Sequence, residues 1–201
     1  CGAPEQILTD AKPHVGTDRL HLAIRELLDR IRRFGGEVRF QTCLHDLTIA
    51  DDRVQSVMLR NVDGTVERLT PGSLVLAIGH SARDTFELLQ NRGVYMEPKA
   101  FSVGVRIEHR QDWLNRAQYG AFAGHPALGA ADYKLAMHTA SGRGVYTFCM
   151  CPGGTVIAAS SEIGGVVTNG MSEFARDGEN ANSALLVGVT PADFGSDHPL
   201  A

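Results

Sequence analysis

The sequence predicts an α/β segment over residues 1–94, followed by a mostly β segment over residues 95–201. Between residues 17 and 34 the apolar residues recur every three or four positions, as they do on one face of an α-helix. Short extended stretches joined by turn residues follow this helix, and beyond Gly93 nearly every stretch has the character of a β-strand. At 201 residues the chain is long enough for one large domain or two small ones.

The first expected element is an amphipathic helix from Thr17 to Phe34. The hydroxyl of Thr17 is a suitable N-cap, because it can accept a hydrogen bond from an unpaired backbone N–H of the first turn. Gly35 and Gly36 favour the end of the helix, since glycine readily adopts the left-handed conformation found there.

An antiparallel meander is expected next. Alternation predicts a first strand at residues 37–40, and two further strands are separated by Asp51–Asp52. Asp63–Gly64 is a strong hairpin signal before the last strand. The predicted strands are 37–40, 44–50, 53–61 and 65–69.

The apolar run SLVLAIG, residues 73–79, predicts a short strand that is buried on both faces. A second helix is expected after it, capped by Ser81 or Asp84 and ending near Gly93. In the second segment we predict a short helix at 111–118 and strands at 101–109, 133–139, 145–151 and 155–162.

Charge and composition exclude several classes of partner. A net charge of −4 provides no basic surface for nucleic acid or anionic lipid. No stretch approaches the roughly 18 apolar residues of a membrane span, and the first residues do not resemble a signal peptide. The cysteines are too few and too irregular for a disulfide framework. We therefore expect a cytoplasmic protein with reduced thiols, no metal site, and neither nucleic acid nor membrane as a partner.

Six motifs in succession carry a resemblance to a known family: ILTDAKPHVGTDRL, LAIGHSARDTFELL, FSVGVRIEH, LGAADYKL, FCMCPGGTVIAASSE and GGVVTNGMSEFARDGENANSALLV. Together they resemble the bacterial FAD-dependent dehydrogenases known as NAD(FAD)-utilizing dehydrogenases. The resemblance implies a partial Rossmann-like FAD/NAD(P)-binding domain, ahead of a mostly β substrate domain. It implies an FAD-dependent oxidoreductase, a flavoprotein acting on a small-molecule substrate, with NAD(P) as a possible second cofactor.

The chain departs from such flavoproteins in one respect. It has no Gly-x-Gly-x-x-Gly after a strand, the motif whose backbone binds a pyrophosphate at a helix N-terminus. We therefore expect an internal fragment that binds FAD weakly or not at all. The alternative is a stand-alone binding or structural domain whose flavin site has decayed.

The resemblance also implies which positions lie near the cofactor. Leu44 corresponds to the strand residue whose backbone approaches the adenine, although a plain core role explains it equally well. The residues expected to pass the flavin pyrophosphate are Ala77, Ile78, Gly79, His80 and Ser81. Gly79 would allow a close approach because it has no Cβ, unless this segment only forms a tight turn with a helix cap. His14, in the loop before the first helix, lies toward the flavin, unless it is an ordinary loop histidine.

The turn containing Asn169 and Gly170 resembles the one that comes near the isoalloxazine ring. Polar residues after it, Arg176, Asp177, Asn180 and Asn182, either line a site or cap turns.

Cys149 and Cys151 form a Cys-x-Cys pair ahead of Pro152–Gly153–Gly154. On a regular strand both thiols would project from the same face. Three interpretations follow: two buried thiols before a turn, which we favour, a redox pair that exchanges electrons with a flavin, or part of a metal site, which lacks further ligands at suitable spacing. The catalytic residues are not predicted.

Overall fold

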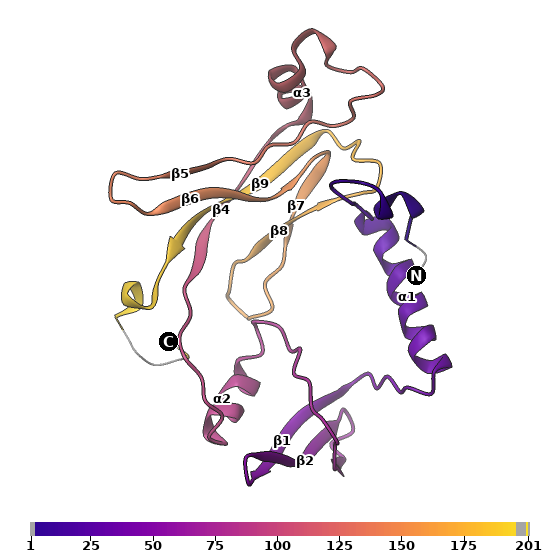
Figure 1. Ribbon diagram of the computed structural model, residues 1–201, viewed down its shortest axis with the longest axis vertical. Helices are drawn as coiled ribbons and strands as arrows, with labels where there is room; N and C mark the ends of the chain where they lie inside the picture. The colour runs from indigo at the N-terminus through magenta and orange to yellow at the C-terminus, as the bar shows by residue number, and fades with distance from the viewer. Residues whose placement is uncertain (1–2, 196–199, 201) are drawn as a thin grey trace. The chain divides into compact units, whose positions relative to one another are not determined.

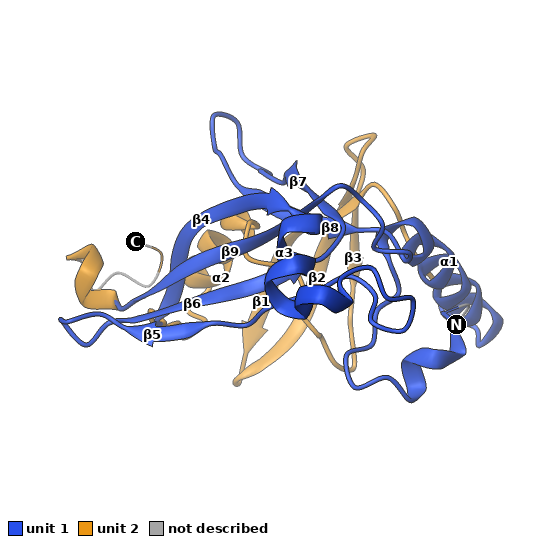
Figure 2. Cartoon of the chain, turned by 90° about the horizontal axis from the view of Figure 1, so that it is seen from above, with its two compact units in different colours: residues 1–36, 100–190 blue, residues 37–99, 191–201 orange. Residues whose placement is uncertain are grey.

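The computed structural model describes residues 3–195 and 200. These residues form two compact units, the first within residues 1–36 and 100–190 and the second within residues 37–99 and 191–201 (Figure 2). The first 36 residues therefore group with the second half of the sequence. The predicted domain limits, 1–94 and 95–201, stay a prediction.

Unit 1 is built on a four-stranded antiparallel sheet in the order β4-β9-β6-β5 (Figure 1). Its strands are β4 (Phe101–Arg110), β9 (Asn180–Val189), β6 (Gly144–Cys151) and β5 (Ala136–His138). A separate antiparallel pair is formed by β7 (Gly154–Ala158) and β8 (Thr168–Ser172). The four strands expected in this half are confirmed with shorter limits for β5 and β7, whereas β8 and the long β9 were not predicted.

Unit 1 also contains several short helices besides its sheets. The predicted helix after β4 is confirmed as α3 (Gln111–Tyr119), which continues into a 3-10 turn, η2 (Gly120–Phe122). The side chain of Leu114 in α3 packs with Ala131 and Ala181 in a small buried cluster. Another 3-10 turn, η1 (Glu5–Leu8), precedes the main helix of the unit.

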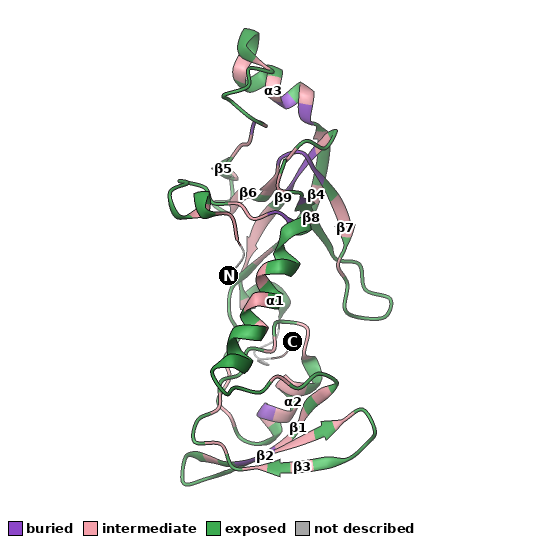
Figure 3. Ribbon diagram, turned by 90° about the vertical axis from the view of Figure 1, so that its right-hand side faces the viewer, coloured by how far each residue is buried: buried purple, intermediate pink, exposed green. Residues whose placement is uncertain are grey.

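That main helix, α1 (Thr17–Arg33), confirms the predicted helix to within one residue. The expected cap is wrong, because Gly16 holds the N-cap position and the Thr17 hydroxyl donates instead to the Ser172 carbonyl at 3.2 Å. No residue of α1 is buried, and its apolar stripe is open to solvent, with Leu27 46% and Ile31 43% exposed (Figure 3). The helix has the apolar stripe of a helix that packs on another surface, but no described residue covers this stripe.

Unit 2 contains the predicted meander, with strand order β1-β2-β3. The strands are β1 (Thr42–Ala50), β2 (Arg53–Asn61) and β3 (Val66–Leu69). Asp51 and Asp52 both have positive φ, at 52° and 56°, as the two-residue turn that matches strand twist requires. The strand expected at 37–40 is absent from the described structure, because these residues have no partner strand.

The second unit also contains α2 (Arg83–Asn91) and a 3-10 turn, η3 (Pro191–Phe194). The predicted caps are wrong here too: Ala82 precedes the helix, and no side chain caps it. Its core is apolar, with Leu47, Val57 and Leu89 buried together.

The run at residues 73–79 is not a strand, and Val75 is 86% exposed. A strand buried on both faces needs neighbours on both sides, and none of the described segments pairs with this one. All strand pairs among the described residues are antiparallel, so no Rossmann-like parallel layer is seen in them. The structure thus shows a mixed α/β chain dominated by antiparallel sheet.

Candidate functional site

A pocket of about 260 Å³ in unit 1 contains two of the residues predicted to lie near a cofactor, His14 and Gly170. We call it the Gly170 pocket. Three segments form it: the loop that enters α1, the end of β6, and the middle of β8 with the turn after it. It is lined by residues 14–17, 20, 150–152, 170–172 and 176. Asn169, the remaining predicted residue of this unit, is exposed and adjoins the pocket in β8.

The loop before α1 is fixed to the segment that follows β8. His14 Nε2 lies 2.9 Å from the Glu173 carbonyl, and because a carbonyl only accepts, Nε2 carries the proton. The imidazole stacks on Phe174 with an interplanar angle of 8°, and the Arg19 guanidinium lies 3.6 Å from the centre of the same ring. The Phe174 N–H donates to Asp18 Oδ1 at 2.8 Å. One wall of the pocket is therefore held by the contacts that His14, Asp18 and Arg19 make with Phe174.

Gly16 is required at the start of this wall. Its φ is +83°, and a Cβ there would lie 2.3 Å from the Phe174 nitrogen. Any other residue would push the loop away from the segment it is bonded to. The pocket wall thus depends on a glycine that the motif did not single out.

Gly170 forms the base of the pocket against a polar cluster. A Cβ at this position would meet Asn182 Oδ1 at 2.2 Å, Arg106 Nη1 at 2.4 Å and Cys151 Sγ at 2.7 Å. Arg106 Nη1 donates to Asn182 Oδ1 at 2.7 Å and to the Cys149 carbonyl at 3.2 Å. The absence of a side chain at Gly170 is what allows the guanidinium and the amide to lie directly behind the pocket.

Three nitrogen atoms around this cluster are buried without a hydrogen-bond partner among the described residues: Arg106 Nε, Arg176 Nε and Asn182 Nδ2. Buried donors are nearly always paired in folded proteins, so such atoms call for an explanation. The residues that line the pocket include the cation Arg176 but no aspartate or glutamate. The site therefore offers donors and positive charge to a ligand that brings acceptors.

The two thiols do not adopt the geometry predicted for them. The pairing of β6 with β9 skips between Phe148 and Cys151, and Cys149 has a φ of +46°. This bulge breaks the alternation on which the same-face prediction rested. Cys149 is exposed and not part of the core, whereas Cys151 lines the pocket and its Sγ lies 3.3 Å from the Cys149 carbonyl. The turn at Pro152–Gly153 is confirmed, and Cys1 lies outside the described residues.

The other predicted cofactor residues belong to unit 2. Leu44 is partly buried against the apolar core of that unit. Ala77 and Ile78 lie in the unpaired run, and Gly79 has a φ of +73° with open space beside its Cβ position. His80 lines a separate cavity of about 210 Å³, and Ser81 lies in the turn before α2. Their roles stay predictions.

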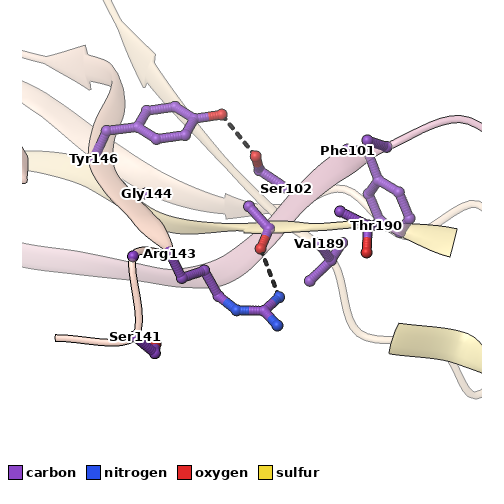
Figure 4. Close-up of a pocket in the computed structure, with 11 residues that line it drawn as sticks. Phe101, Ser102, Ser141, Arg143, Gly144, Tyr146, Val189 and Thr190 are labelled. Carbon is purple, nitrogen blue, oxygen red and sulfur yellow. Dashed lines mark hydrogen bonds between the residues drawn. The ribbon is translucent and has the colours of Figure 1, made fainter. Parts of the chain in front are cut away.

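A second cavity in unit 1, of about 720 Å³, lies where β4, β6 and β9 come together (Figure 4). Tyr146 donates to the Ser102 hydroxyl at 2.9 Å, and Arg143 donates to the Gly188 carbonyl at 2.9 Å. None of the residues that the sequence predicted to lie near a cofactor lines this cavity.

Over residues 3–195, no group of three or more His, Cys, Asp or Glu side chains is placed to hold a metal ion. None of the helices in the same range is long and apolar enough to cross a membrane.

The antiparallel sheet and the donor-rich pocket of unit 1 lie in a region that has known relatives. Residues 100–201 match the family described as "FAD-dependent protein, C-terminal domain-like". The match covers just over half of the 201 residues, and the chain belongs to this family. The chain is also 50% identical, over 200 residues, to an uncharacterized protein of Clostridium beijerinckii. That alignment takes in 99% of this chain but only 37% of the relative's length.

Proposed function

We propose that the chain forms part of a longer FAD-dependent oxidoreductase, a dehydrogenase of a small-molecule substrate, and that the Gly170 pocket adjoins the flavin ring. One observation carries this proposal: His14 and Gly170, which two separate motifs of the sequence associated with the flavin, line a single pocket. The family of the C-terminal half supports the same cofactor by its description.

The residues of the pocket fit such a group. The pyrimidine edge of a flavin presents carbonyl oxygens and ring nitrogens, and the pocket presents the Ser172 side chain and the backbone of a glycine-lined wall. Gly170 allows the Arg106 guanidinium and the Asn182 amide to lie directly behind the pocket, because a side chain there would overlap both of them. Bound FAD would supply the hydride chemistry, and these residues would orient the ring and set the charge around it.

Two exposed apolar features support the view that the chain works within a larger protein. The stripe of α1 and the run at residues 73–79 are open to water, although their sequences are those of packed elements. We propose that the run pairs with strands of a Rossmann-like domain, and that NAD(P) serves as the electron partner. The relative's additional length is consistent with such a domain.

The proposal is tested by comparing Gly170→Ala with Gly144→Ala in the full-length protein. Gly144 lies in β6, in the four-stranded sheet of the same unit, and has no atom near its Cβ position, so its replacement should leave FAD bound. We expect the wild type and Gly144→Ala to keep their flavin absorbance after desalting. The Gly170→Ala protein should lose most of it.

A full-length wild-type protein that keeps no flavin would contradict the proposal, and would favour the alternative of a decayed site. Equal flavin content in the two variants would place the ring away from Gly170.

A further inference from the structure

Arg176 stands out among the residues of the Gly170 pocket because its charge is not neutralised. It lines the pocket, its Nε is buried without a hydrogen-bond partner, and no ion pair among the described residues includes it. A guanidinium that is partly removed from water is stable when an anion accepts its hydrogen bonds. The described residues provide no such acceptor.

The backbone holds Arg176 in place. Its φ is +53°, a left-handed conformation that residues other than glycine rarely adopt. A Cβ on Gly153 would lie 1.9 Å from the Arg176 carbonyl oxygen, and Gly178 N donates to the Gly153 carbonyl at 3.2 Å. Two glycines therefore allow the segment that carries Arg176 to lie against the turn after β6. Strain of this kind persists where the surrounding structure determines the position of a functional side chain.

A second guanidinium adds to the positive charge. Arg106 lies directly behind Gly170 and is hydrogen-bonded only to neutral acceptors, Asn182 Oδ1 and the Cys149 carbonyl. Asp18, which contacts the same wall, already accepts a hydrogen bond from the Phe174 N–H and pairs with Arg19. One arginine thus lines a small pocket without a carboxylate, and a second lies behind its base.

We propose that Arg176 binds the carboxylate of a small organic acid, which is the substrate class of this site. The planar guanidinium matches the two oxygens of a carboxylate, and a pocket of about 260 Å³ accommodates a molecule of that size. The identification of this acid as the substrate rests on the proposed function. The acceptor atoms at the edge of a flavin ring would accept hydrogen bonds from the same guanidinium. The test therefore distinguishes a bound carboxylate from the flavin as the partner of Arg176.

The test uses the full-length protein with benzoate as the probe, and benzyl alcohol as its uncharged analogue. Binding is measured by calorimetry for the wild type, Arg176→Met, Arg176→Lys and the control Arg116→Met, and the midpoint potential of any bound flavin is measured in the same samples. Arg116 is exposed in α3 and paired with Asp112, away from the pocket. Thermal melting establishes that each variant is folded.

We expect Arg176→Met to weaken benzoate binding by roughly 10- to 100-fold, as for the loss of hydrogen bonds between charged groups. Benzyl alcohol binding and the flavin potential should stay unchanged, Arg176→Lys should recover part of the affinity, and Arg116→Met should match the wild type. Benzoate binding that survives Arg176→Met overturns the assignment, whether or not the flavin potential falls. If the wild type binds benzoate through Arg176 but holds no FAD, the carboxylate site stands and the proposed oxidoreductase does not.

Discussion

The interiors of the two units are built from different kinds of side chain. In unit 2 the buried residues are mainly large and apolar, with Leu47, Val57 and Leu89 between 3% and 6% exposed. In unit 1 the largest fully buried side chains are Asn182 and Ser183. Apolar burial stabilises a fold at roughly 25 cal/mol per Å² of buried surface, whereas buried polar groups do so only when they are fully paired. Unit 2 thus has an apolar core, whereas polar side chains make up much of the interior of unit 1.

Unsatisfied polar atoms show the same contrast. Of the buried side-chain atoms without partners in the described residues, only Ser56 Oγ belongs to unit 2. The others belong to Arg106, Arg176, Asn182 and His109 in unit 1. A polar interior that is only partly paired lowers stability and leaves donors for a ligand. From this difference we expect mutations in unit 2 to lower mainly the stability of the fold. Mutations in unit 1 should affect both its stability and its binding of a ligand.

The largest effect on stability is expected from Leu47→Ala, which should lower the free energy of unfolding by about 3 kcal/mol because it opens a cavity in the core of unit 2. Urea unfolding and amide hydrogen exchange in β1 and β2 would measure it. Leu8→Ala is the matched control, since Leu8 is 84% exposed and its loss should cost less than about 0.5 kcal/mol. Equal effects for the two variants would contradict the assignment of the core.

Asn182→Ala should cost unit 1 about 2 kcal/mol, because the Arg106 guanidinium loses its side-chain acceptor. Trp113 in α3 is the only tryptophan of the sequence, so its fluorescence during unfolding reports on unit 1. Asn182→Asp keeps an acceptor oxygen and adds a negative charge, and should be more stable than Asn182→Ala. If both variants unfold like the wild type, Arg106 does not depend on Asn182.

The smallest effect is expected from pH in unit 2. The Arg92 guanidinium donates to both carboxylate oxygens of Asp46, and the bond from Arg92 Nε to Asp46 Oδ1 is 2.7 Å long. The Leu47 N–H donates to the same carboxylate. These hydrogen bonds hold the pKa of Asp46 below its usual range. A lowered pKa stabilises the fold above the pKa of the unfolded state, and this contribution is lost as pH falls through the folded-state pKa. The pair is solvent-exposed, so its effect is small.

Asp46→Asn should therefore be slightly less stable than the wild type near neutral pH, and the two melting curves should converge as the pH falls below about 4. A difference that persisted in acid would assign the effect to packing and not to charge.

Local elements could be predicted from the sequence wherever short-range physics decides them. The stripe of α1 and the Asp51–Asp52 turn depend on helical periodicity and on the residues that tolerate positive φ, and both were found as expected. The run at 73–79 could not be predicted correctly, because a buried strand exists only where neighbours pair with it. The Cys-x-Cys geometry failed for a related reason, since the bulge at Cys149 arises from pairing with β9.

The site could be predicted only in part. Motif resemblance pointed to His14 and Gly170, and the density of polar residues pointed to Arg176 and Asn182 without deciding between a site and turn caps. Arg106 was missed, although a charge between two apolar residues, Val105 and Ile107, was a usable signal. Arg106, Cys151 and Asn182 meet beside Gly170. Their meeting depends on the register of β4, β6 and β9, which no local pattern encodes.

The uncovered stripe of α1 also matters to the protein during its synthesis. A nascent helix that displays leucine and isoleucine to water is a binding site for chaperones and an early target for proteases. A newly made chain therefore stays exposed to these factors for as long as the stripe is uncovered.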